Sequence, residues 1–288
     1  MHSLNLYFTG KHSDICIIIT ATYLPLPEPS RNRFFNVFEE LINFQTLPDQ
    51  FDFPFDYQPH TLSVLAADKL KMYLETQTQW KHNFGLSGDE NDVIGKMFGV
   101  LVVRTPQDEI GYLAAFSGKL AGGNQHSEFV PAIFDGTADG SFLNDGMLEL
   151  TRINEEIRIL KDLSEITNAG QILALKNQRK LHSVSLQNRI FDQYHFLNQA
   201  GSTKSLREIF KATSNKNPPA GAGECAAPKL LQYAFQNEMK PLCMAEFWWG
   251  LSPKSDFWKH GQFYPACREK CEPILAHMLS GMDVADKP

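Results

Sequence analysis

The sequence lacks the features that place a chain in a membrane or in a secretory pathway. No apolar run approaches the roughly 20 residues of a membrane helix, and the richest one, residues 16–19, is followed by Thr20 and Thr22. The first residues carry no basic segment of the kind that opens a signal peptide. We therefore expect a cytoplasmic protein with no membrane partner.

The chain also lacks an excess of positive charge and an even set of cysteines. Its net charge is −6, so it is not expected to grip phosphate backbones over its whole surface. Five cysteines, spread over a long chain, argue against a disulfide framework and leave free thiols or a metal site open. A Walker loop, a serine hydrolase elbow and an H-E-x-x-H helix are absent from the sequence.

What is present is an ordinary globular composition, with 288 residues of which 43% are hydrophobic. Residues 61–77 carry a helical apolar stripe, and a shorter stripe predicts a helix over residues 32–44. Residues 97–103 and 110–116 are continuous β-rich runs around a polar turn, which predicts a hairpin in the middle of a sheet.

Residues 145–198 predict a pair of long helices joined by a turn at residues 168–170. Residues 145–165 hold six acidic and three basic side chains, whereas residues 171–212 hold seven basic and two acidic ones. The second helix is thus the best basic surface of the chain, although an acidic helix pairing with a basic one would explain the same pattern. The candidate RNA contacts on it are Lys176, Arg179, Lys180 and Arg189.

The last third of the sequence holds four of the five cysteines. We expect helices over residues 225–237 and 265–279, with a strand over residues 242–249 between them. Cys267 and Cys271 are four residues apart, and Cys225 opens the earlier helix, where backbone dipoles favour a thiolate. Cys225, Cys267 and Cys271, alone or with His260, are therefore candidate zinc ligands. The alternative is that they are small buried hydrophobic residues, as Cys243 is expected to be.

Aromatic and basic side chains interleave over residues 247–268. Trp258 and Lys259 are candidate RNA contacts, because an aromatic ring can stack on a base and a lysine can contact a phosphate group. A packed subdomain with a few surface lysines would give the same composition.

The order of elements resembles that of the zinc-dependent nucleoside deaminases, whose signature is a His or Cys followed two residues later by Glu, and then Pro-Cys-x-x-Cys. Ala227 stands where the proton-carrying Glu belongs. Ala266 separates Pro265 from Cys267, and three residues instead of two lie between Cys267 and Cys271. The resemblance implies the fold and a zinc site, and Ala227 argues against the activity.

A longer resemblance is to the N-terminal region of a subset of bacterial RluA-type RNA pseudouridine synthases. It is carried by residues 221–234 (GAGECAAPKLLQYA), 245–250, 252–255 and 259–275, and by earlier segments at 53–60, 95–103, 112–122 and 204–210. In that family a separate isomerase domain follows and carries a His-Arg-Leu-Asp motif, and no Arg-Leu-Asp occurs in this sequence. The resemblance therefore implies no catalytic residue here.

Together these features predict an α+β fold with an α/β-type core: a mixed, deaminase-like sheet with flanking helices and an inserted helical hairpin. The expected parts are an aromatic and proline-rich arm (1–46), two halves of the core (47–142 and 206–288), and the hairpin (143–205). The expected function is that of an accessory module that positions ribosomal or other structured RNA for a C-terminal pseudouridine synthase domain. The alternative is a deaminase-like, metal-dependent enzyme acting on a nucleobase or nucleoside.

Overall fold

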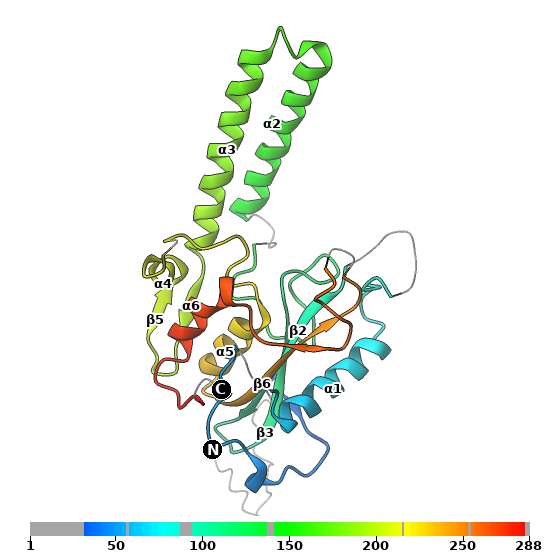
Figure 1. The fold of residues 1–288 in the computed structure, drawn as a ribbon, viewed down its shortest axis with the longest axis vertical. Helices are drawn as coiled ribbons and strands as arrows, with labels where there is room; N and C mark the ends of the chain where they lie inside the picture. Colours follow the sequence, from blue (N-terminus) through cyan, green and yellow to red (C-terminus); the bar gives the residue numbers. More distant parts are fainter. Residues whose placement is uncertain are drawn as a thin grey trace, which may run out of the picture. The chain divides into compact units, whose positions relative to one another are not determined.

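The computed structural model describes residues 32–55, 58–86, 94–136, 141–214, 216–252 and 255–285. Its centre is a five-stranded sheet in the order β1 (Asn36–Val37), β3 (Ile110–Phe116), β2 (Lys96–Arg104), β6 (Lys240–Trp249) and β7 (Phe263–Tyr264) (Figure 1). Every pairing in this sheet is antiparallel. The prediction of a mixed sheet is thus wrong. β6 does run parallel to β3, but β2 lies between them and forms ladders with both.

One face of the sheet is covered by α1 (Thr61–Thr76), as the apolar stripe predicted. His60 begins the helix, since its ring Nδ1 accepts the N–H of Leu62. Leu62, Ala66 and Leu70 pack with every second side chain of the strands, such as Val100 and Val102 of β2. Because successive strand residues point to opposite faces, the intervening ones are left for the other side of the sheet.

The opposite face is covered by α5 (Ala226–Gln236) and α6 (Arg268–Met278), which pack with α4 (Leu206–Lys211) over the remaining strand residues. Gly99 of β2 lies directly under α5. A Cβ atom there would be 2.9 Å from Cβ of Ala226, so the missing side chain lets the start of α5 approach the sheet. The predicted hairpin β2–β3, the strand β6 and both cysteine-bearing helices are confirmed within one or two residues at most ends.

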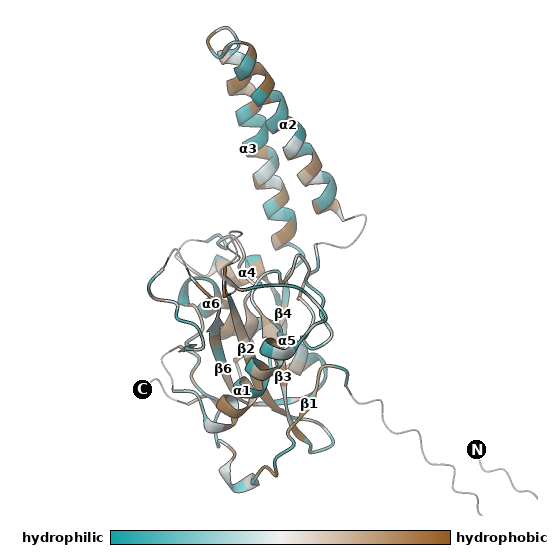
Figure 2. Ribbon diagram, turned by 90° about the vertical axis from the view of Figure 1, so that its right-hand side faces the viewer, coloured by the Kyte–Doolittle hydropathy of each residue, from teal (hydrophilic) through white to brown (hydrophobic). Residues whose placement is uncertain are grey.

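α2 (Phe142–Ser164) and α3 (Ala169–Phe191) lie between the two halves of this core in sequence and pack along one another (Figure 1). Their contact has its own small apolar cluster, made by Ile153, Ile157, Ile172 and Leu175. Hydrophobic and hydrophilic residues alternate along both helices (Figure 2), and several large apolar side chains are exposed. Among them are Leu148, Leu163 and Leu181.

Two predictions about element boundaries are wrong. Residues 32–43 form no helix, and Phe44 only begins the short 3-10 helix η1 (Phe44–Thr46). Asn36 and Val37 instead pair with β3, and the neighbouring Phe35 and Phe38 reach the cores on opposite faces of the sheet. The second long helix ends at Phe191 rather than near residue 198, because the chain turns into β4 (His195–Leu197), which pairs with β5 (Thr203–Ser205). In the described part of the chain, no helix is long and apolar enough to cross a bilayer.

Candidate metal centre

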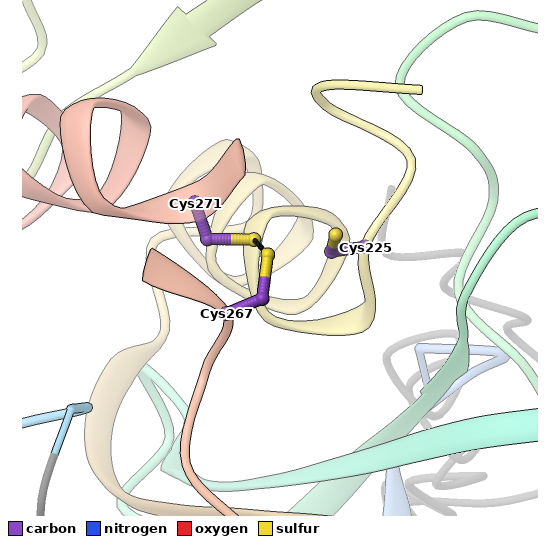
Figure 3. A group of neighbouring side chains, drawn as sticks. All are labelled: Cys225, Cys267 and Cys271. Carbon is purple, nitrogen blue, oxygen red and sulfur yellow. Dashed lines mark hydrogen bonds between the residues drawn. The ribbon is translucent and has the colours of Figure 1, made fainter. Parts of the chain in front are cut away.

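Three cysteine side chains converge where the first turns of α5 and α6 meet (Figure 3). The sulfur atoms of Cys225, Cys267 and Cys271 all lie within 4.8 Å of one another. The Sγ atoms of Cys267 and Cys271 share a hydrogen bond at 3.6 Å. Ligands about 2.3 Å from a tetrahedral zinc ion are roughly 3.8 Å apart, so a small closure would bring these donors to zinc geometry. The three candidate zinc ligands therefore lie close enough together for one shared site.

The sulfur positions follow from how the two helices begin. Cys225 is the N-cap of α5 and Cys267 is the N-cap of α6, and neither side chain caps its own helix by a hydrogen bond. Cys271 lies one turn inside α6 and is fully buried, whereas Cys267 is exposed. The sequence predicted that both Cys267 and Cys271 lie inside the helix. In the structure Cys267 precedes α6, so the two thiols lie along the first turn of that helix.

The thiols do not titrate independently. The pKa of Cys267 is lowered, first by its contact with the thiol of Cys225 and then by its contact with Cys271, and the backbone at the start of α6 favours the thiolate further. The pKa of Cys225 is raised by its contact with Cys267 and by burial, and the pKa of Cys271 is raised by its contacts with Cys225 and Cys267 and by burial. Of the three thiols, that of Cys267 loses its proton most readily. Metal binding would replace the thiol protons that remain.

A buried carboxyl group lies on the sheet side of this cluster. Glu246 of β6 is 3% exposed, and its Oε1 accepts the N–H of Ala227 at 3.3 Å. Among the described residues its Oε2 has no hydrogen-bond partner. Burial, and then the negative charge of Cys267, raises the pKa of Glu246 to about 8. A carboxyl group with this environment is a mark of functional sites.

A buried lysine ties the same helix to the loop after β3. Lys229 Nζ donates to the backbone oxygens of Phe116 at 2.8 Å and Gly118 at 3.3 Å, and Gly118 N–H donates to the oxygen of Glu224. Desolvation lowers the pKa of Lys229 to about 8. Glu224 and Lys229 also line a small hollow of roughly 60 Å³ beside the start of α5, and no cysteine is among its described lining residues.

Sequence reasoning missed Glu246 and Lys229. Each is a charged residue inside an otherwise apolar run, and that contrast is the signal that could have found them. His260, the proposed fourth ligand, is placed elsewhere: its Nδ1 accepts the N–H of Gly250, and its ring lies against Trp249. Cys243 is buried in the core on the α1 side, as expected, and Cys16 lies outside the described residues.

The four candidate RNA contacts of α3 fall into two groups. Arg179 Nη1 donates to Oδ1 of Asn154 on α2, and the guanidinium of Arg189 lies 4.1 Å from the ring centroid of Phe142 on α2. Lys176 and Lys180 are exposed, one turn apart, and form no ion pair with a described residue. The expected single patch is therefore divided, with the arginines holding the helix pair together and the lysines facing solvent.

Trp258 and Lys259 lie in an aromatic cluster beside β6. The ring of Trp258 stacks on Trp248 with centroids 5.4 Å apart and meets Tyr264 edge-on. The backbone N–H of Lys259 donates to the hydroxyl of Tyr264, and its side chain is exposed. Phe257, which is 64% exposed, is the more accessible ring of this cluster.

No known protein family, curated protein or solved structure matches the chain.

Proposed function

We propose that this chain is a zinc-binding accessory module that holds RNA for a pseudouridine synthase domain. In this proposal the core is deaminase-like, α2 and α3 form an inserted helical hairpin, and zinc fixes the start of α5 to that of α6 through three cysteines. The sequence resemblance to RluA-type enzymes supports the RNA-related role, and the thiol cluster supports the metal.

The charge arrangement of α2 and α3 carries the RNA proposal. Within the described residues, the acidic groups of α2 that form ion pairs do so with basic groups of α2 itself: Glu149, Glu155, Glu156, Asp162 and the C-cap Glu165 pair with Arg152, Arg158 or Lys161. The alternative of an acidic helix neutralising a basic one thus finds no support in this part of the chain. Lys176 and Lys180 keep their positive charge available for phosphate groups.

The test is charge reversal at these two lysines. The variant Lys176→Glu/Lys180→Glu should weaken binding of the full chain to a ribosomal RNA stem-loop and lower the slope of log affinity against log salt by roughly one and a half, since each phosphate contact contributes about 0.7 to 0.9. Lys216→Glu/Lys240→Glu makes the same change in net charge at exposed lysines outside α3 and should leave both quantities near wild type. Equal effects of the two double variants would contradict an RNA surface on α3.

A second candidate function is favoured by the cysteine cluster together with Glu246. Hydrolytic removal of an exocyclic amine needs a water molecule whose oxygen bonds to the ring carbon, and a group that carries a proton to the departing nitrogen, which leaves as ammonia. Zinc held by three protein ligands keeps a fourth position for water and makes that water more acidic. The three cysteines would hold the metal, and the hydrogen bond between Glu246 and Ala227 puts a carboxyl group beside the residue that replaces the expected Glu.

A further inference from the structure

We infer that Glu246 is the proton-carrying carboxyl group of the cysteine site, supplied by strand β6 in place of the helix residue that Ala227 replaces. This inference rests on the proposed metal site and deepens the second candidate function. Glu246 would accept a proton from water at the open metal position, through Oε2, and release it to the departing group of the substrate.

The first support is position. Ala227 lies two residues after Cys225 in α5, and its backbone N–H donates to Oε1 of Glu246. The methyl side chain of Ala227 is fully buried, so a longer side chain there would need space that the packed core does not leave. Gly99, the Cα partner of Glu246 across β2 and β6, leaves room for both the carboxyl group and the helix start.

The second support is the free oxygen atom. A carboxyl oxygen without a protein partner is available to water or to a ligand. Oε2 of Glu246 accepts no hydrogen bond from a described residue, and it belongs to the side chain that interacts electrostatically with Cys225 and Cys267. A role limited to packing would be met better by an apolar residue of similar volume.

The third support is that the hydrogen bond fixes only one of the two oxygens. Oε1 anchors the group to the backbone of α5, which stops the side chain from turning away, while Oε2 stays available for proton transfer. This division between anchoring and reacting atoms is what a positioned acid or base requires.

The experiment uses the full chain loaded with cobalt(II), which reports its ligands by visible absorption. The variant Glu246→Gln keeps the volume of the side chain and an oxygen to accept the Ala227 N–H, so it should fold and bind one cobalt ion per chain like wild type. Wild type should show a spectral transition between about pH 6 and 9 as water at the open position loses its proton. In Glu246→Gln the midpoint should move by at least one pH unit, because no carboxyl group is left to bind that proton.

The control is Glu272→Gln, which removes an exposed carboxyl group from α6, next to Cys271 in sequence. Its cobalt spectrum should titrate as wild type does. Cobalt binding with the same midpoint in wild type and Glu246→Gln would overturn the role of Glu246 while leaving the metal site standing. Failure of the wild-type chain to bind cobalt at all would overturn the metal site and this inference together.

Discussion

At the scale of single residues, the side of the sheet under α5 holds two buried ionisable groups of opposite kind. Glu246 and Lys229 are both less than 5% exposed, and each makes its hydrogen bonds to backbone atoms. Burying an ionisable group away from water and without an ion partner destabilises the folded state. Glu246 faces the thiols, and Lys229 fixes the loop after β3 to the same helix.

The lowered pKa of Lys229 makes the stability of the chain depend on pH in a defined direction. Between pH 8 and 10.5 the unfolded chain holds a proton that the folded chain has released, so the free energy of unfolding rises with pH in this window. The gain is at most about 1.4 kcal/mol for each pH unit. In Lys229→Met this dependence on pH should be missing. The difference in the free energy of unfolding between wild type and Lys229→Met should therefore change between pH 8 and 10.

Urea unfolding of both proteins at pH 7.5, 9 and 10 measures this difference, and other groups that titrate in the window cancel in the comparison. Parallel curves for the two proteins would show that Lys229 keeps an ordinary pKa in the folded state.

At the scale of elements, α2 and α3 have little to hold them besides each other. Their shared cluster contains four buried residues, centred on the fully buried Ile153. Ile153→Ala should cost about 2 to 4 kcal/mol, because it removes buried methyl groups from a contact that has few others. The loss should concentrate in the helix pair.

Amide hydrogen exchange tests this localisation. In Ile153→Ala, residues 142–191 should exchange faster, while β2 and β6 keep their protection. Leu181→Ala is the matched control, because this side chain lies in the same helix pair and is 72% exposed. It should change neither the exchange of residues 142–191 nor the protection of β2 and β6. Uniform loss of protection over the whole chain would mean that the helix pair is part of one cooperative core.

Several elements could be predicted from the sequence because one physical signal dominates each of them. The helix at Thr61–Thr76 has a regular apolar stripe, and β2, β3 and β6 are apolar on both faces because helices cover both sides of the sheet. Residues 32–44 gave the wrong period, since Phe35 and Phe38 fit a helical spacing although they bury on opposite faces. The conformation of that segment is set by its pairing with β3, a tertiary contact that the local sequence does not encode.

The candidate site shows the same division. The spacing of Cys267 and Cys271 and the place of Cys225 at a helix start could be predicted because they are local properties, whereas the approach of the two helix starts was implied only by the deaminase resemblance. Glu246 could not be predicted, since its proximity to Ala227 depends on how β6 lies under α5, 19 residues earlier in the chain. The different roles of the two lysines (Lys176 and Lys180) and the two arginines likewise could not be predicted, because they depend on which face of α3 packs against α2.

At the scale of the whole molecule, a net charge of −6 contrasts with the local excess of positive charge on α3. Such a chain would bind RNA through a limited surface, with general repulsion elsewhere. The three cysteines lie where α5 meets α6, on the opposite side of the sheet from α1. The central claim is therefore that these two helix starts are held together by a metal ion.

X-ray absorption at the zinc edge, on the full chain purified under reducing conditions, tests this claim most directly. We expect one zinc ion per chain with three sulfur ligands at about 2.3 Å and one lighter ligand at about 2.0 Å, which is water or another oxygen or nitrogen donor. Zinc should be lost from Cys225→Ser, Cys267→Ser and Cys271→Ser, and retained in Cys243→Ala. A reduced chain that contains no zinc, or whose zinc has no sulfur ligands, would contradict the account.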